Sequence, residues 1–305
     1  MTTLSNKAAS GVVPRKNRIG ESTGGKIFDV FNVIILCLIS FLCIAPFLYI
    51  FSASVSTVAE VNTRGFFIYP TSFITDAYQF LFKSNLLVGS IGRSVMITVV
   101  GTVLSMTVTV MMSYALSKPD MWGRGLINKL IVFTMLFSGG MIPTYLVVSG
   151  LKLTDTYFAL WLPGLVSAYN MILIRTNIMA LPGELLEAAK VDGCNDFVIF
   201  YKIVLPLIKP SIATFALFYA VGYWNDFFNA TIYLNDMNMW PIQVWLRQIV
   251  LLSAGVSDVT ESTNFIAPST INFAVIIFAT VPILIVYPFI MRYFEKGMMV
   301  GSVKG

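Results

Sequence analysis

The residues of this chain that could act on a partner molecule are concentrated in one charged, amphipathic stretch between two apolar runs. Residues 184–197 read ELLEAAKVDGCNDF, and the chain continues through VIFYKIVLPLIKP to Pro210. A helix that lies on an anionic lipid surface favours a polar face rich in Lys and Arg. Here the acidic side chains outnumber the single base, so lipid binding is disfavoured, and two uses stay open: packing on the chain's own helix ends and docking into a partner. The charged residues concerned are Glu184, Glu187, Lys190, Asp192 and Asp196.

A second polar group lies toward the outer end of an apolar run, in the segment GYWNDFF. It contains Tyr223, Trp224, Asn225 and Asp226. A carboxylate at membrane depth is costly unless it faces water or a partner. The segment is therefore either part of a polar pathway through the membrane or an interfacial aromatic followed by an Asn-Asp pair that ends a helix.

Several kinds of chemistry are disfavoured by what the sequence lacks. It has no histidine, the commonest general base and a usual zinc ligand, and no G-x-x-x-x-G-K-[ST] loop for ATP. Cys37, Cys43 and Cys194 show neither metal-ligand spacing nor a disulfide framework. The 20 basic and 15 acidic residues are scattered at the ends of apolar runs, which argues against a nucleic-acid partner. We expect no catalytic residue, metal ion or cofactor in the chain itself.

The elements that position these residues are predicted to be membrane-spanning helices. The chain is 57% hydrophobic and 11% charged, with a mean hydropathy of +0.80. Apolar runs of about 20 residues recur, which is the length of a helix that crosses a lipid bilayer. The predicted fold is all-α: a basic tail over residues 1–26, then a membrane domain over 27–305 with six spans. The spans are expected at about 27–51, 88–116, 126–148, 157–179, 211–233 and 271–291.

The distribution of Lys and Arg predicts how the chain crosses the membrane. With a cytoplasmic N-terminus, the cytoplasmic side receives fifteen of the cations and the other side five. Both termini are then cytoplasmic, and so is the stretch around residues 180–210. Gly139 and Gly140, followed by Pro143, also predict a break in the third span, either a packing kink or a gating hinge.

The charged stretch itself is predicted to form two short helices. Glu184 suits the first turn of one helix, and Asp192 with Gly193 ends it. Asn195 suits the cap of a second helix, which Pro206 is expected to close. Apolar residues recur at helical spacing on that second helix, giving a mostly aromatic ridge of Phe197, Phe200, Tyr201 and Val204.

The spacing of this stretch resembles the cytoplasmic loop of permease subunits of ATP-binding-cassette importers. The pattern is E-A-A, three residues, G, nine residues and I-x-L-P, and it is met by residues 187–189, Gly193 and residues 203–206. We call residues 180–210 the EAA loop. SYALSKPDMWGR, GYWNDFF and the C-terminal GMMVGSVKG resemble the carbohydrate-uptake branch, in particular the maltose-type second permease and its oligosaccharide relatives.

The resemblance implies that the EAA loop is a coupling helix that docks into a cleft of a cytoplasmic ATPase subunit. Glu187 would accept a hydrogen bond from a basic residue of the ATPase, Ala188 and Ala189 would allow close approach, and Gly193 would permit the turn. The alternative for Glu187 is a local pair with Lys190. Phe197, Phe200 and Tyr201 would either fill the ATPase cleft or pack under the permease's own helices.

The resemblance also implies a function and a set of partners. The chain would be a permease subunit of an ATP-driven sugar importer in a bacterial inner membrane, beside a second homologous permease. Two ATPase subunits would bind ATP and Mg²⁺, and an extracellular solute-binding protein would deliver the sugar. Residues 223–226 would contact the sugar, residues 253–264 would meet the binding protein or form an ordinary exposed loop, and residues 297–305 would enter the ATPase interface or end freely. The alternatives are a membrane-embedded transferase and a permease for another small solute.

Overall fold

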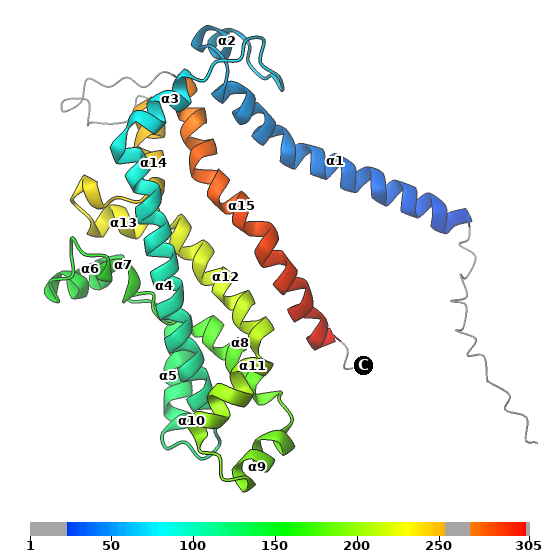
Figure 1. Ribbon diagram of the computed structural model, residues 1–305, viewed down its shortest axis with the longest axis vertical. Helices are drawn as coiled ribbons and strands as arrows, with labels where there is room; N and C mark the ends of the chain where they lie inside the picture. The colour runs from blue at the N-terminus through cyan, green and yellow to red at the C-terminus, as the bar shows by residue number, and fades with distance from the viewer. Residues whose placement is uncertain (1–22, 254–268, 303–305) are drawn as a thin grey trace, which may run out of the picture. The chain divides into compact units, whose positions relative to one another are not determined.

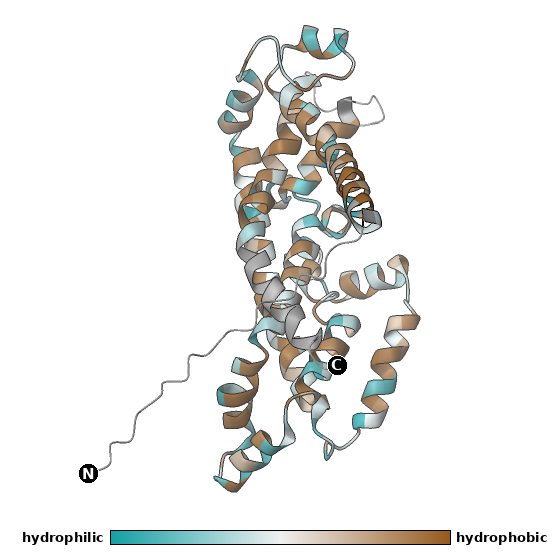
Figure 2. Ribbon diagram, turned by 90° about the vertical axis from the view of Figure 1, so that its right-hand side faces the viewer, coloured by the Kyte–Doolittle hydropathy of each residue, from teal (hydrophilic) through white to brown (hydrophobic). Residues whose placement is uncertain are grey.

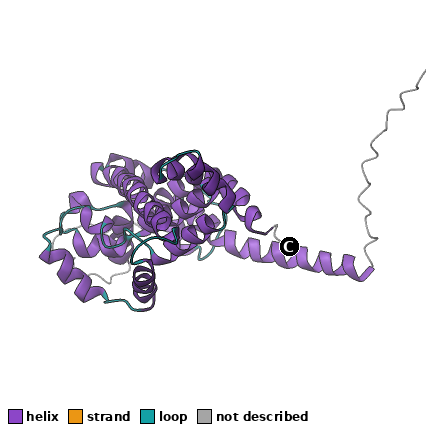
Figure 3. Cartoon of the chain, turned by 90° about the horizontal axis from the view of Figure 1, so that it is seen from below, coloured by secondary structure: helices purple, strands orange, loops and turns teal. Residues whose placement is uncertain are grey.

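Every regular element in the computed structural model is a helix within the residues it describes, 23–253 and 269–302, as Figure 3 shows. This confirms the all-α prediction for the described part of the chain. The chain divides after Tyr49 into two units. The first unit holds most of α1 (Thr23–Ser54), a 32-residue helix whose large apolar side chains between Ile27 and Ile44 are exposed.

The helices of the second unit are assembled on α4. It packs against α12, α8 and α14, and Figure 1 shows it beside α12. After α1, the elements in chain order are α2 (Val58–Thr63), α3 (Asp76–Lys83), α4 (Asn85–Ser117), α5 (Arg124–Leu136), α6 (Met141–Gly150), α7 (Phe158–Trp161), α8 (Ala168–Met179), α9 (Gly183–Val191), α10 (Asp196–Ile199), the π-helix η1 (Phe200–Val204), α11 (Leu205–Leu207), α12 (Lys209–Asn225), α13 (Phe227–Tyr233), the 3-10 helix η2 (Met237–Met239), α14 (Ile242–Ser253) and α15 (Ser269–Ser302).

Three helical segments are each long and apolar enough to cross a membrane: Ile27–Ser54, Asn85–Ser117 and Ser269–Pro288. Two bent helix pairs would raise the number to as many as five if each pair is one span. Figure 2 shows hydrophobic residues, in brown, along much of the long helices. The described residues thus form a membrane-type helical protein, and the arrangement in six spans stays a prediction.

The predicted break in the third span is confirmed. α5 ends at Leu136, α6 begins at Met141, and the two helices are bent by 119°. Gly140, directly before α6, has φ 86°, a backbone conformation that residues with a Cβ rarely adopt. Pro143 lies in the first turn of α6, where its missing N–H removes no helical hydrogen bond. The glycine therefore allows the chain to turn sharply, and the proline fits the first turn of the next helix.

The predicted fourth and fifth spans are not continuous helices, contrary to the simplest interpretation of their apolar runs. Within residues 157–179, α7 is four residues long and α8 begins only at Ala168, after a segment that contains Pro163 and Gly164. Within residues 211–233, the chain leaves the helix at Asp226, between α12 and α13. Residues of both breaks line a cavity, and irregular backbone is tolerated at membrane depth where it lines a cavity or is buried in protein.

Hydroxyl groups on one face of α4 join it to its neighbours. The Ser105 hydroxyl lies 2.8 Å from that of Tyr223, and the Thr109 hydroxyl lies 2.8 Å from that of Tyr219, both on α12. One turn further, Ser113 Oγ donates to a backbone carbonyl of α8 at 3.0 Å. Small side chains and interhelical hydrogen bonds hold helices together where lipid removes the hydrophobic drive for association.

Gly101 lies on the same face and lets aromatic rings approach the α4 backbone. A Cβ at this position would lie 2.8 Å from Cε2 of Tyr223 and 2.9 Å from Cδ1 of Trp161. The indole N–H of Trp161 donates to the carbonyl oxygen of Ile97 at 3.1 Å. The absence of a side chain at residue 101 is therefore a packing requirement.

Candidate functional site

The first half of the EAA loop folds as predicted. α9 follows Pro182, has Glu184 in its first turn and ends at Val191, with Asp192 as its C-cap. Gly193 has φ 80°, and apart from its two chain neighbours no residue has an atom within 4 Å of where its Cβ would be. The glycine is thus required by the backbone conformation and not by crowding, because this region of φ disfavours residues with a Cβ. The predicted turn at residues 192–193 is confirmed.

The second half of the loop begins and ends close to where it was predicted to. The side chain of Asn195 caps α10 and accepts a hydrogen bond from the N–H of Val198 at 2.9 Å. The helical run that α10 begins continues through η1 and α11 and ends at Leu207, one residue after the predicted closure at Pro206. The chain then bends by 79° on passing into α12.

The side chains of the predicted docking residues divide into exposed and buried groups. Glu187 and Ala188 are exposed, whereas Ala189 is buried in a core cluster that also contains Ile199 of α10. The expected contact of Ala189 with a partner does not fit this geometry, because its methyl group packs inside the chain. The small side chain at residue 189 is instead part of the internal packing of the loop.

The aromatic ridge divides in the same way. Phe197 is 72% exposed and Tyr201 is 65% exposed. Phe200 is half-buried, and its ring centre lies 4.8 Å from that of Tyr114 on α4. The two uses that the sequence left open therefore belong to different residues: Phe200 packs under the chain's own helices, and the other two rings are available to a partner.

Glu187 has no local ion pair in the structure. The ion pairs formed within the described ranges are Arg64–Glu60 and Lys118–Asp196, so the alternative pairing of Glu187 with Lys190 is not present. An exposed carboxylate without a local cation is available for a charge-assisted hydrogen bond to another protein.

The end of α4 next to the loop is held by two arginines that the sequence analysis did not single out. Arg124, at the start of α5, and Arg175, on α8, each donate from Nε to the carbonyl oxygen of Leu116 at 3.0 Å. Arg175 also donates to the side chain of Asn128 at 3.1 Å. Cations at the C-terminal end of a helix satisfy its free carbonyls and complement its dipole. The fixed side chains join α5 and α8 to the end of α4.

A polar cavity of about 280 Å³ lies where α7 and α8 face α12 and α13. It contains the two breaks described above, so loop backbone and side chains share its wall. We call it the polar cavity. Its polar lining residues are Ser167, Asn170, Tyr219, Tyr223, Asp226 and Asn229.

Asp226 has a fixed geometry in this cavity. Its carboxylate caps α13 by accepting a hydrogen bond from the N–H of Asn229 at 3.1 Å, and the Asn229 side-chain amide donates to both of its oxygens at 3.0 Å. Both interpretations that the sequence left open therefore apply. Asp226 lies where α12 ends and α13 begins, and its carboxylate also faces the cavity.

Tyr219 positions the loop that closes the cavity. Its hydroxyl accepts a hydrogen bond from the N–H of Ser167 at 2.8 Å and also contacts Thr109 of α4. Ser167 in turn caps α8 through the N–H of Asn170. Tyr219 was missed by the sequence analysis, although it lies four residues before Tyr223 and hence on the same helix face.

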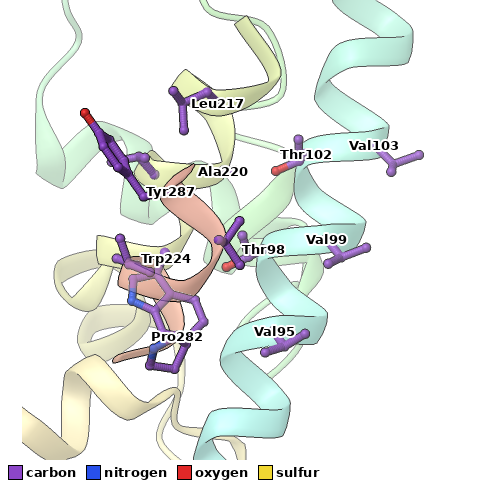
Figure 4. Close-up of a pocket in the computed structure, with 13 residues that line it drawn as sticks. Val95, Thr98, Val99, Thr102, Val103, Leu217, Ala220, Trp224, Pro282 and Tyr287 are labelled. Carbon is purple, nitrogen blue, oxygen red and sulfur yellow. The ribbon is translucent and has the colours of Figure 1, made fainter. Parts of the chain in front are cut away.

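Trp224 and Asn225 do not share the cavity of their neighbours. Asn225 is exposed, and its amide donates to the carbonyl oxygen of Val221 at 2.9 Å. Trp224 is buried and lines a separate, apolar cavity of about 340 Å³ between α4, α12 and α15 (Figure 4). Successive residues of a helix project about 100° apart, so Tyr223 and Trp224 point to different sides.

The apolar cavity is poorly suited to a sugar. Figure 4 shows Thr98 and Thr102 with their hydroxyls toward α12, while Val99 and Val103 point away. Both hydroxyls and the indole N–H of Trp224 have no hydrogen-bond partner in the described structure. Three polar atoms among apolar walls cannot satisfy the many hydroxyls of a saccharide. The polar cavity is therefore the better candidate for contact with a hydrophilic solute.

Some of the predicted features lie outside the described residues. These are residues 1–22 of the basic tail, residues 254–264 of the predicted binding-protein loop and the last three residues of the C-terminal tail. The region before that loop is partly helical. It contains α14, on which Ile242 and Val244 are buried. Within the described ranges no group of three or more Cys, Asp or Glu side chains is placed to hold a metal ion.

Comparison with known proteins assigns the chain to a family. Residues 19–300 match the family described as "Binding-protein-dependent transport system inner membrane component". The chain belongs to this family, whose members are inner-membrane components of transport systems that depend on a binding protein. The resemblance to importer permeases is thereby confirmed.

Individual relatives are similar over nearly their whole length. Protein LplC of Bacillus subtilis (strain 168) is 50% identical over 291 residues, covering 93% of this chain and 97% of LplC. The polygalacturonan/rhamnogalacturonan transport system permease protein YtcP of the same organism is 48% identical over 283 residues, covering 92% and 99%. A chain in the crystal structure of a bacterial ABC transporter involved in the import of the acidic polysaccharide alginate is similar with a TM-score of 0.82 at 32% identity, covering 90% of this chain and 98% of that one.

Proposed function

We propose that the chain is a transmembrane permease subunit of an ATP-driven importer that carries saccharides across a bacterial inner membrane. The family match over residues 19–300 carries this proposal. The saccharide assignment is supported by the names of the similar proteins, a polygalacturonan/rhamnogalacturonan permease and an alginate transporter. A permease for another small solute would share the family and the fold, and transport assays with different solutes distinguish the two.

The partners are proposed from the family. The chain has no phosphate-binding loop of the G-x-x-x-x-G-K-[ST] type, which supports the proposal that ATP and Mg²⁺ bind to two cytoplasmic ATPase subunits and not to this chain. A second permease subunit completes the pathway through the bilayer, and an extracellular solute-binding protein delivers the sugar. No nucleic acid takes part.

The exposed side of the EAA loop is the proposed docking surface for an ATPase subunit. Glu187 supplies an unpaired carboxylate, Ala188 allows close approach, and the rings of Phe197 and Tyr201 project from the neighbouring helical segment. An exposed aromatic pair beside a charge is typical of residues that anchor a protein–protein interface. Gly193 and Phe200 position this surface without forming it.

The polar cavity is proposed to line the sugar pathway. The hydroxyl of Tyr223, the carboxylate of Asp226 and the amide of Asn229 offer donors and acceptors to sugar hydroxyls. Trp224 and Asn225 belong to the packing around this wall. The cavity lies between broken helices, which is where membrane transporters place their substrates.

Transport would proceed by alternating access. Closure of the ATPase dimer on ATP moves the docked EAA loops, and the helices pass from an inward-facing to an outward-facing arrangement. This switch requires that ATP and the loaded binding protein each bind the two arrangements unequally, because a ligand shifts an equilibrium only by its differential affinity.

Charge reversal at Glu187 tests the docking surface. Glu187→Lys should abolish ATP hydrolysis stimulated by the sugar-loaded binding protein and reduce copurification of the ATPase subunit, because the new cation repels the basic group that the carboxylate should bind. Membrane insertion should be unchanged, since Glu187 is exposed and unpaired. Asp120→Lys, a matched reversal at an exposed residue outside the loop, is the control. Unchanged stimulation in Glu187→Lys would exclude the docking role.

A further inference from the structure

The EAA loop is fastened to α4 by two pairs of side chains that interlock. Tyr114 and Lys118 lie four residues apart at the end of α4, and Asp196 and Phe200 lie four residues apart at the start of the second helical part of the loop. Residues with this spacing lie one above the other on a helix face. We call these four residues the clasp.

Each member of the clasp contacts the opposite segment. Lys118 Nζ lies 2.7 Å from Asp196 Oδ1, and Tyr114 donates from its hydroxyl to the carbonyl oxygen of Asp196 at 3.1 Å. The ring of Tyr114 packs on that of Phe200, and the centre of the Tyr114 ring lies 4.7 Å from Lys118 Nζ. The ammonium group of Lys118 thus contacts the Asp196 carboxylate and the face of the Tyr114 ring at the same time.

The charges of the clasp also suit the helix ends on which they lie. Lys118 is the C-cap residue of α4, where a cation is favoured, and Asp196 begins α10, where an anion is favoured. The Lys118 side chain is 21% exposed and that of Asp196 is 67% exposed. An ion pair with this much solvent contact adds little to folding stability. The geometry of this ion pair is better explained as positioning the EAA loop on α4 than as stabilising the folded chain.

The clasp continues into the contacts that build the polar cavity. Going back along α4 from Tyr114, Thr109 bonds to the Tyr219 hydroxyl and Ser105 to the Tyr223 hydroxyl, and both tyrosines line the cavity. A single helix therefore joins the loop at its end to the cavity wall along its length.

We propose that the clasp, through its Lys118–Asp196 ion pair, is a positioning joint. It makes α4 move with the EAA loop, so that displacement of the loop reaches the polar cavity. The inference rests on the proposed docking of the loop to an ATPase subunit. Without the Lys118–Asp196 ion pair the loop would still be held by the apolar contacts of Ala189 and Ile199, but it could shift against α4. The expected defect is therefore in coupling and not in assembly.

The test uses the complete transporter in proteoliposomes with the sugar-loaded binding protein, and it measures sugar transported per ATP hydrolysed. Lys118→Asp and Asp196→Lys should each lower this ratio about fivefold or more, the range of ordinary coupling energies, while the ATPase subunits still copurify. The double variant Lys118→Asp with Asp196→Lys should recover part of the ratio, since it restores an opposite-charge pair although each charge then lies at the helix end that disfavours it. Lys129→Asp and Asp120→Lys reverse exposed charges nearby and serve as controls that keep the normal ratio.

Neutral variants keep the test decisive if a charge reversal prevents assembly. Lys118→Gln and Asp196→Asn remove the attraction without creating repulsion and should lower transport per ATP in assembled complexes. A normal ratio in these neutral variants would overturn the proposal, as would a double reversal that assembles and stays uncoupled. If the unmodified chain recruits no ATPase subunit, the proposed function fails instead, so the two failures are distinguishable.

Discussion

At the residue scale, Glu60 of α2 is an example of a charge whose environment is set by neighbours that are close in sequence. Its Oε1 accepts hydrogen bonds from the Thr71 hydroxyl at 2.7 Å, the Thr71 N–H at 2.8 Å and Arg64 Nη1 at 2.5 Å. The Thr71 side-chain hydrogen bond is the main cause that lowers the pKa of Glu60 to about 2 from its ordinary 4.5; burial opposes the change, and the Thr71 N–H and Arg64 add to it.

The lowered pKa of Glu60 predicts an acid-sensitive contribution to stability. Because the folded-state pKa is below the unfolded value, the carboxylate favours folding above about pH 4.5, and the contribution is lost as the pH falls toward about 2. Thermal melting of the purified protein and of Glu60→Gln should show an advantage for the unmodified chain near neutral pH that shrinks in acid. Asp76→Asn, on the neighbouring α3, is the control. An advantage that is the same at every pH would contradict the assignment.

At the scale of elements, the decisive contacts are those of α4 with α12 and α8. The apolar run of α4 is visible in the sequence, and so are its small residues at fourth positions, Gly101, Ser105, Thr109 and Ser113. What the run does not show is which helices face it, because Tyr219 and Tyr223 are more than a hundred residues away. The breaks within residues 157–179 and 211–233 are likewise not visible in the hydropathy of these runs, because hydropathy reports burial in lipid and not helix continuity.

Filling the close approach at Gly101 should weaken this packing. Gly101→Ala places a methyl group within 3 Å of ring atoms of Tyr223 and Trp161, and overpacking of this kind costs about 1–3 kcal/mol. Gly92→Ala is a matched control in the same helix, since its Cβ would meet no atom within 4 Å beyond its chain neighbours and the backbone of its own helix, and alanine is the better helix former. Melting temperatures in detergent should fall for the first variant and stay level or rise for the second. Equal melting temperatures would show that α12 shifts to accept the methyl group.

At the scale of the whole molecule, the orientation in the membrane decides whether the EAA loop can meet a cytoplasmic ATPase. The cation count places the loop inside and the segment around Ser72 outside. The chain contains three cysteines, Cys37, Cys43 and Cys194, that would have to be replaced before single cysteines are introduced.

Single-cysteine labelling tests this orientation. In a cysteine-free background, Lys190→Cys should be protected in intact cells from a maleimide that cannot cross the membrane and should react in inverted vesicles. Ser72→Cys should show the opposite pattern, because both residues are exposed and differ only in the predicted side. Labelling of Lys190→Cys in intact cells would place the loop outside and exclude docking to a cytoplasmic subunit.

The sequence by itself determined the features that depend on short-range physical chemistry. The hydropathy required a helical membrane protein, the glycines at residues 140 and 193 marked turns because their backbone conformation disfavours a Cβ, and Asn195 marked a helix start because its side chain satisfies a free N–H. The E-A-A spacing was sufficient to identify the family. None of these features needs a contact between distant parts of the chain.

Only the tertiary structure decided which side chains face each other. It separated Tyr223 and Asp226 from Trp224, turned Phe200 inward while Phe197 and Tyr201 stayed exposed, and brought Asp196 to Lys118 across 78 residues. The physical reason is that a helix presents its residues at fixed angles, but the side that meets a neighbour depends on where the connecting segments bend, and those bends set the position of every later helix.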